Sequence, residues 1–318
     1  MSVVYFENKY YPKMKSGPDF REERTFAPER GVAFEGEGGI FTSSVNMGGP
    51  VGFGGDLSIP LKEWVVKSLG DTGAVETDYL PGTCFRRIWR PLVCAGTLYK
   101  TIDQKKLNDS FVSLRMLLSK LVDLFETVEP NTANSSVYGH KIREILLLAC
   151  MEVESSLSAV LKENGYSSAG RLTTNDYVKL FQPMLLDGYE LALQSYPDFP
   201  PFSPFKGWDA KQPTGSLTWY DAYNKTKHDR EDELKLATLG NAVMAVGAAV
   251  VVFHAQFGLN FGTGVLDQKS PVIRNVFRIV TLDFKKYERE FYIPRVFLQA
   301  GTSPTPSPDW NVINYPFE

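Results

Sequence analysis

The stretch WYDAYNKTKHDRED, Trp219 to Asp232, holds the densest set of residues whose types and spacing suit chemistry. If it is helical, Tyr220, Asn224 and the Lys227/His228 pair share one face, because residues four and seven or eight positions apart are neighbours on a helix. Asn224 and His228 are direct neighbours at a spacing of four. An imidazole beside an amide and a lysine suits proton transfer or phosphate binding.

The segment around 137–163 carries charged residues that would complement this strip. On a helix, His140, Arg143 and Glu154 fall in one narrow sector that also contains apolar side chains. A charge in an apolar band needs a partner. We therefore expect Glu154 to face a cation or the imidazole of the strip, and Arg143 to contact a bound anion or Asp221.

These residues divide into two groups of candidates. The catalytic candidates are His228, Lys227, Asn224 and Arg143. The binding candidates are Tyr220, Glu154, His140 and Arg230. The partners expected for Glu154 are Lys227, His228 or Arg230.

An interpretation without chemistry is also open. A histidine just before a buried helix often caps that helix or borders the core, and Trp219 and Tyr223 suit packing. Arg143, Glu152 and Glu154 suit internal ion pairs. The run KHDREDE can be the solvated start of the last helix, since acidic residues are favoured at a helix N-terminus.

Helical segments are expected to position these residues. Apolar residues at spacings of three and four predict helices from 103 to about 128 and from about 137 to 163. A third helix is expected from about 176 to 194, bent or split by Pro183. The strip then begins a fourth helix, and a fifth runs over 232–257, with a possible bend near the junction.

The two ends of the chain indicate β structure. Residues 1–100 are rich in glycine, proline and aromatics, which favours hairpins or irregular coil, and two C-terminal runs, NVFRIVTLDF and REFYIPRVFL, suit strands that pair with those hairpins. The expected fold is mainly α, a four- to five-helix bundle with a small β-containing cap from both termini. The expected domains are 1–100 (irregular or β-rich), 101–258 (the helical bundle) and 259–318 (β and coil packing on the N-terminal part).

Composition limits the classes of partner. The 318 residues include 34 basic and 37 acidic side chains, a net charge of −3, so a nucleic-acid contact must be local. Three cysteines without a Cys-x-x-Cys pair and three histidines predict neither a metal site nor a cofactor. The N-terminus lacks an apolar signal region, and the most apolar run, AVMAVGAAVVVF, is short for a bilayer. We therefore expect a cytoplasmic protein without a membrane partner.

The helix containing REILLLACMEVE, followed by WYDAYNKTKHDRE and ATLGNAVMAVGAAVVV, resembles the HEPN superfamily of helical nucleotide-binding proteins over about residues 137–258. It is similar in particular to an uncharacterised bacterial branch with a YN-x-x-KH-x-R signature. The resemblance implies a dimeric, metal-independent endoribonuclease of toxin–antitoxin or phage-defence type. His228 would take the catalytic histidine role. The arginine expected at 221–223 is missing, which leaves Arg143 as the alternative source of that charge.

Three functions remain open. The first is a metal-independent ribonuclease or RNA-binding effector of bacterial defence, in which a neutral His228 would take the proton of a ribose 2′-hydroxyl. The second is a non-catalytic helical module for homodimerisation or partner docking. The third is a small-molecule or nucleotide-binding protein with its pocket between the second and fourth helices, under the Pro200–Trp208 loop.

Overall fold

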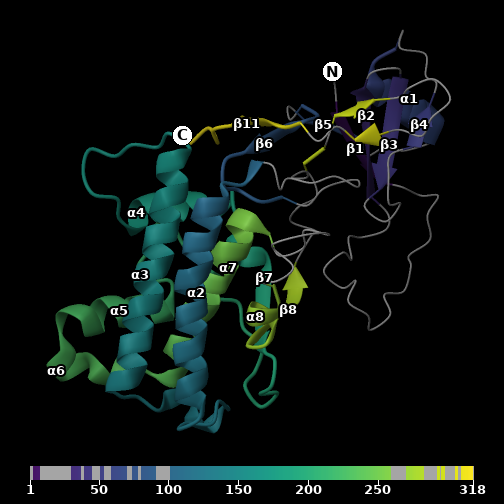
Figure 1. The fold of residues 1–318 in the computed structure, drawn as a ribbon. Coiled ribbons are helices and arrows are strands. Elements are labelled where there is room, and N and C mark those ends of the chain that lie inside the picture. The colour runs from purple at the N-terminus through teal and green to yellow at the C-terminus, as the bar shows by residue number, and fades with distance from the viewer. Residues whose placement is uncertain are drawn as a thin grey trace. The chain divides into compact units, whose positions relative to one another are not determined.

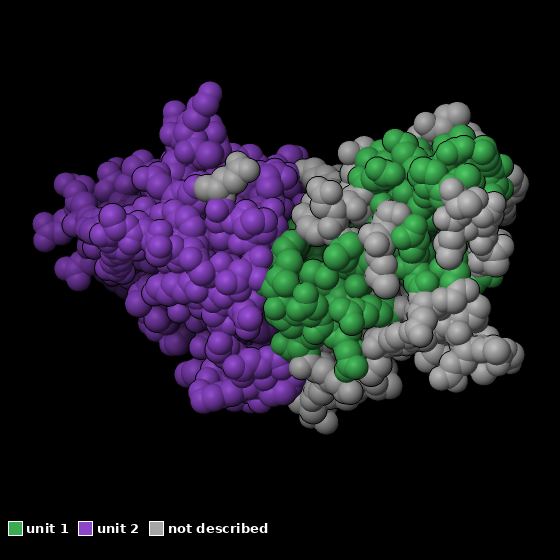
Figure 2. All heavy atoms as spheres, turned by 90° about the horizontal axis from the view of Figure 1, so that it is seen from above, with its two compact units in different colours: residues 1–85, 90–101, 283–313 green, residues 86–89, 102–282, 314–318 purple. Residues whose placement is uncertain are grey.

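The described part of the protein is most continuous in its middle. The computed structural model describes residues 3–7, 30–36, 39–44, 51–53, 59–69, 74–77, 80–90, 101–258, 270–282, 292–293, 295–297, 305–306 and 309–317. These residues divide into two compact units (Figure 2). Unit 1 takes residues from 1–85, 90–101 and 283–313, and unit 2 takes residues from 86–89, 102–282 and 314–318. The second unit contains both segments from which we drew site candidates.

Unit 1 contains a five-stranded antiparallel sheet in the order β4-β3-β2-β1-β5. Its strands are β1 (Val3–Glu7), β2 (Arg30–Gly36), β3 (Gly39–Ser44), β4 (Val51–Phe53) and β5 (Val75–Thr77). Successive side chains of a strand point to opposite faces of the sheet. Both faces of this sheet carry buried apolar residues. Val3 and Tyr5 belong to one apolar cluster, whereas Val4 and Phe6 belong to another.

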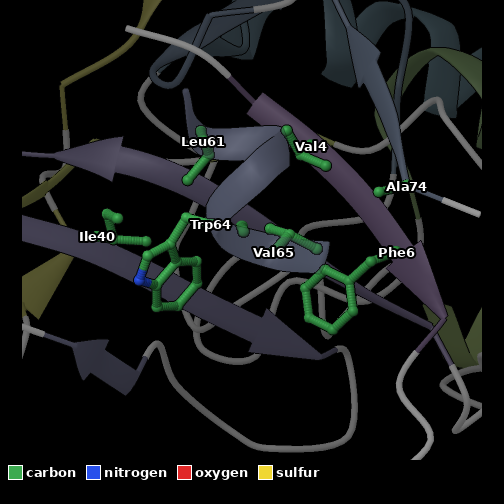
Figure 3. Packing of buried hydrophobic residues seen from close by; sticks show 8 residues of the cluster. Val4, Phe6, Ile40, Leu61, Trp64, Val65 and Ala74 are labelled. Atoms are coloured by element: carbon green, nitrogen blue, oxygen red, sulfur yellow. The ribbon is translucent and has the colours of Figure 1, made fainter. Parts of the chain in front are cut away.

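Helix α1 (Leu61–Leu69) covers the second of these faces. Its buried residues Leu61, Trp64 and Val65 recur at spacings of three and one, so they form one stripe of the helix. Figure 3 shows this stripe packed on Val4 and Phe6 of β1. Two smaller sheets complete the unit: β6 (Thr83–Phe85) pairs in parallel with β11 (Asn311–Ile313), and β9 (Val296–Phe297) pairs with β10 (Thr305–Pro306).

Unit 2 is built on long helices that contact one another. They are α2 (Gln104–Phe125), α3 (His140–Glu163), α5 (Thr218–His228) and α7 (Leu239–Phe257). α7 is apolar on nearly all sides and is buried along most of its length, with α2, α3 and α5 in contact with it (Figure 1). Side chains cap two of these helices: Asp103 accepts hydrogen bonds from two backbone N–H groups of α2, and Thr238 accepts one from α7.

Shorter elements lie between and after the long helices. They are η3 (Ala133–Ser136), α4 (Thr174–Tyr177), η4 (Val178–Leu180), η5 (Leu186–Gly188), α6 (Arg230–Glu233), η6 (Leu234–Leu236) and α8 (Ser270–Arg274). Strand β7 (Tyr189–Leu193) pairs antiparallel with β8 (Phe277–Leu282). β7 also approaches α7 closely: a Cβ on Gly247 would lie 2.7 Å from Phe202 and 3.1 Å from Leu191.

Asn164 joins two distant segments of unit 2 at the C-terminal end of α3. Its buried side-chain amide donates to the Arg86 carbonyl over 2.7 Å, and its oxygen accepts from the Tyr315 backbone N–H over 2.8 Å. These partners follow directly after β6 and β11, where the chain passes from unit 1 into unit 2. One side chain therefore binds two of the segments that enter unit 2, those that begin at 86 and at 314.

The predicted fold class is wrong. The described residues are mixed α and β, with a five-stranded sheet in one unit and the β7–β8 pair in the helical unit, so the chain is not a four- to five-helix bundle with a small β cap. The helices predicted over 103–128 and 137–163 are present as α2 and α3. The sheet was underestimated because its strands come from separate short runs among glycines, which carry little periodic signal.

The helix expected over 176–194 is also wrong. Short helical turns run up to Gly188, interrupted at Leu185, whose φ of 51° places it in the left-handed region, and the strand β7 follows. β8, within the run NVFRIVTLDF, pairs with β7 rather than with the N-terminal hairpins. Residues 270–282 and 314–317 also belong to unit 2, whereas our expected boundaries lay near 100 and 258.

Among the described residues, α7 has the length and composition of a membrane-crossing helix, although 83% of its most apolar window is buried inside the protein. The core helix of a globular unit has the same properties. The run AVMAVGAAVVVF, which we judged too short to cross a bilayer, is part of this longer helix of 19 residues.

Candidate functional site

The strip forms α5 because its apolar and aromatic residues recur on one helical face. Its buried residues are Trp219, Tyr220, Ala222, Tyr223 and Thr226. The indole N–H of Trp219 donates to the Pro204 carbonyl over 2.8 Å, and its ring meets Phe205 edge-on. Trp219 and Tyr223 are thus packed into unit 2, as we predicted for both.

A polar network links the buried face of α5 to Glu154 of α3. The Tyr220 hydroxyl donates a short hydrogen bond to one Glu154 carboxylate oxygen, and the Tyr223 hydroxyl lies 3.4 Å from the other. Lys227 Nζ donates to the Tyr223 hydroxyl over 3.0 Å and lies 4.9 Å from the centre of that ring. Glu154 therefore contacts two tyrosines rather than Lys227, His228 or Arg230, and Tyr223 separates it from Lys227.

The protonation of this network favours hydrogen-bond donation over nucleophilic chemistry. Burial, followed by the hydrogen bond to Glu154, raises the pKa of Tyr220 far above its usual value. Burial also raises the pKa of Tyr223, against the opposing effect of Lys227. The buried thiol of Cys150 has its pKa raised by burial and by Glu154. At neutral pH these groups keep their protons, and their burial keeps them from a substrate, so the network holds α5 on α3.

Arg143 makes a different contact at the C-terminal end of α5. Its Nε and Nη2 donate to the Thr226 carbonyl over 3.0 Å and 2.7 Å. The last carbonyls of a helix lack partners within the helix and lie at the negative end of its dipole, so a guanidinium suits this position. Asp221, the alternative partner that we expected, forms an ion pair with Lys225 over 2.7 Å.

Three exposed candidates lie close in sequence to the contact between Arg143 and Thr226, at the end of α5 and the start of α3. His228 is the last residue of α5, exposed to solvent and two residues after the carbonyl that Arg143 contacts; Lys227 lies between them and is also exposed. His140 is exposed and begins α3 one turn before Arg143. We call His140, Arg143, Lys227 and His228 the terminal cluster. It combines two imidazoles and two cations from two helices.

Two other candidates have local structural roles or positions. The half-buried Asn224 donates its side-chain amide to the Tyr220 carbonyl over 3.0 Å, within α5. Arg230 is exposed at the start of α6, after Asp229 has ended α5 and capped α6 through the Asp232 N–H. The bend that we considered near the junction is therefore a break between two helices.

Sequence reasoning missed the hydroxyl of Tyr223 and the carbonyl of Thr226 as polar partners. The spacing of three between Tyr220 and Tyr223, and of four between Tyr223 and Lys227, was a signal for the first. No side-chain pattern marks the second, because every helix ends with free carbonyls.

Comparison of the chain with protein-family models, with curated proteins and with solved structures finds no match. Within the described ranges there is no group of three or more His, Cys, Asp or Glu residues that could hold a metal ion.

Proposed function

We propose that the terminal cluster binds the phosphate backbone of RNA and that His228 cleaves the bound strand without a metal. The observation that supports this proposal is the contact of Arg143 with the last turn of α5. The strip has no arginine ahead of His228. Arg143 of α3 supplies a positive charge at the Thr226 carbonyl, and Thr226 lies two positions before His228 in α5. The HEPN-like activity that the sequence suggested needs an arginine and a histidine together.

The cluster suits a phosphate through both charge and geometry. Arg143 uses Nε and Nη2 for the Thr226 carbonyl, which leaves N–H groups of a five-donor guanidinium for a phosphate oxygen. Lys227 is held by Tyr223, and that hydrogen bond raises the pKa of its ammonium group, so the charge persists at neutral pH. Because the whole chain has a net charge of −3, binding would be local and sensitive to salt.

His228 would act as the general base in the cleavage step. It takes the proton of a ribose 2′-hydroxyl, and the 2′-oxygen attacks the adjacent phosphorus. The bond between phosphorus and the 5′-oxygen breaks, which gives a 2′,3′-cyclic phosphate and a 5′-hydroxyl. A proton must reach the leaving 5′-oxygen, and the imidazole of His140, at the start of α3, is the candidate donor. Arg143 and Lys227 stabilise the charge that develops on the phosphate.

The buried network would contribute by positioning rather than by contact with RNA. Tyr220 and Tyr223 attach α5 to Glu154, and this attachment fixes where the last turn of α5 ends. A displacement of about 1 Å in a catalytic group can cost roughly a hundredfold in rate. Glu154 and Tyr220, candidates for binding in the sequence, thus become positioning residues.

The test uses the full chain, a single-stranded RNA and a DNA of the same sequence, all in EDTA. The proposal predicts salt-dependent binding of both strands and cleavage of the RNA alone, because DNA lacks the 2′-hydroxyl. End-group analysis should find the 2′,3′-cyclic phosphate. Lys227→Gln should weaken binding, whereas Lys211→Gln, an exposed lysine in the loop before α5, should not.

The outcomes separate binding from cleavage. Binding without cleavage, with the same Lys227 dependence, would retain the RNA site and remove the catalytic role of His228. Absence of binding at low salt would contradict the proposal as a whole.

A second candidate function is a non-catalytic interaction module. The observation in its favour is that Lys225, Lys227 and Arg143 all contact groups of the protein itself. Under this alternative the strip serves only to join α5 to α3, and His228→Ala changes no activity on RNA.

A further inference from the structure

We infer that Tyr138, two residues before α3 begins, is a platform on which one unpaired base of the bound strand stacks. The inference rests on the proposed function and deepens it, because it names unpaired RNA as the substrate class and Tyr138 as the residue that selects it. The Tyr138 side chain is 55% exposed. Among the side chains that the structure describes, it is the only exposed aromatic.

This exposure is unusual for an aromatic residue of this chain. The sequence contains 21 phenylalanines, 15 tyrosines and 5 tryptophans, and the others whose side chains are described are buried or half-buried. Within the described ranges, the Tyr138 side chain has neither a hydrogen bond nor a ring contact. A single exposed apolar residue is normal in a protein, so the exposure alone does not mark a site. The support and the position of Tyr138 carry the inference.

The backbone of Tyr138 is held in place although its ring is exposed. Tyr138 forms an antiparallel bridge with Thr238, whose side chain caps α7. The carbonyl of the preceding residue, Val137, accepts a hydrogen bond from the Leu239 N–H over 2.7 Å. A tyrosine side chain has only two χ angles, so a ring on a fixed backbone loses little conformational freedom when it binds a ligand.

The segment that carries Tyr138 leads directly into the terminal cluster. Tyr138 precedes His140 by two residues, which limits the separation of their Cα atoms to about 7 Å. The carbonyl of Gly139, between them, accepts a hydrogen bond from the Arg143 backbone N–H over 2.9 Å. Arg143 is therefore one turn from this segment. A phosphate held by His140 and Arg143 would bring an adjacent base within reach of the Tyr138 ring.

Stacking on this ring would distinguish unpaired strands from duplexes. Every base has a π face, so an aromatic side chain can stack on any base that is not already covered. In a duplex, neighbouring base pairs cover both faces of each base, whereas the phosphates stay accessible. The phosphate contacts of the terminal cluster would thus accept either form, and the contact with Tyr138 would be available only to the unpaired strand.

The test measures Kd for the full chain and a short 2′-O-methyl RNA, either single-stranded or annealed to its complement. The methyl group blocks the 2′-oxygen, so binding is measured without cleavage. Tyr138→Ala should weaken binding of the single strand by about tenfold and leave binding of the duplex unchanged. Tyr138→Phe, which keeps the ring, should bind both forms as the wild type does.

Val112→Ala is the matched control for the loss of an exposed apolar side chain. Val112 is 46% exposed and lies on α2. It is about 12 Å along that helix from Lys120, whose ion-pair partner Glu144 lies in the first turns of α3. Val112→Ala should bind the single strand with the wild-type Kd.

Abasic substitution of the strand tests whether the base itself is the contact. Removal of single bases in turn should identify one position at which wild-type binding weakens by about the factor that Tyr138→Ala causes. At that position the abasic strand and the intact strand should bind Tyr138→Ala equally, because both changes remove the same contact.

The outcomes distinguish this inference from the proposed function. A wild type that binds no strand at low salt would overturn both. Weaker binding by Lys227→Gln but unchanged binding by Tyr138→Ala would retain the RNA site and overturn the stacking role. Equal weakening of single-strand and duplex binding by Tyr138→Ala, or a loss that does not depend on any base, would also overturn that role, because it would show a contact with the sugar–phosphate backbone.

Discussion

Replacement of Tyr220 by phenylalanine removes one hydroxyl and leaves the buried ring of α5 in place. The Glu154 oxygen that this hydroxyl contacts would lose its donor, and the weaker contact with Tyr223 at 3.4 Å would remain. A hydrogen bond to a charged group contributes about 1.5–3 kcal/mol. Since Glu154 is only partly buried and water can replace part of the bond, we expect a loss of about 1.5–2 kcal/mol in the free energy of unfolding.

Thermal unfolding of the full chain measures this loss. For a unit of this size, 1 kcal/mol corresponds to about 2–4 °C, so Tyr220→Phe should lower Tm by roughly 3–8 °C. Tyr138→Phe is the matched control, because that side chain is exposed, and its effect should stay within about 0.5 kcal/mol. An unchanged Tm for Tyr220→Phe would refute the role of the network in holding α5 on α3.

The pH dependence provides a second readout of the same network. The pKa of Tyr220 is raised in the folded protein, so folding favours the protonated phenol. Its contribution to stability is therefore fully present below the unfolded pKa of about 10 and is lost as pH rises beyond it. Wild-type stability should fall in this alkaline range, and the fall should be shallower in Tyr220→Phe. Equal slopes in the two proteins would count against the assigned proton position.

Three further predictions concern stability. Asn164→Ala should cost about 2–3 kcal/mol, because the buried amide makes three hydrogen bonds, two of them to Arg86 and Tyr315, and should speed removal of 314–318 by carboxypeptidase; equal digestion rates would argue against the link. Burial, with a smaller effect of Arg274, lowers the pKa of His254 to about 3. Because the unfolded chain binds that proton from about pH 6.5 downward, stability should fall with acid by up to about 1.4 kcal/mol per pH unit, and His254→Gln should reduce this slope. Gly247→Ala should cost about 1–3 kcal/mol through overpacking, whereas Gly170→Ala, which meets no atom within 4 Å, should be nearly neutral; equal Tm values would contradict that difference.

The parts of the fold that followed from sequence are local. α2 and α3 each bury a stripe whose spacing is visible in the chain, and Asp103 marks the start of α2. β7 was missed because its stability depends on β8, about 90 residues further along the chain, and no local pattern reports that pairing. The left-handed residue Leu185, which interrupts the helical turns just before β7, is not a glycine, so the sequence does not mark it.

The candidate site was partly predictable for a similar reason. Helical spacing put Tyr220 and Lys227 near one face and placed Glu154 toward the strip. It did not determine which donor Glu154 would bind, because long side chains choose among several neighbours within reach. The Arg143 contact with a backbone carbonyl was hidden, since the acceptor is present at every helix end.

The measurement that tests the central claim most directly is the RNA cleavage rate of His228→Ala, determined together with its Tm. The imidazole is exposed and lies outside the Glu154 network, so its removal should change stability by no more than about 0.5 kcal/mol. We predict that cleavage in EDTA is lost while Tm is unchanged. Cleavage at the wild-type rate would contradict the catalytic role of His228, and a lowered Tm would show instead that His228 is a structural residue of unit 2.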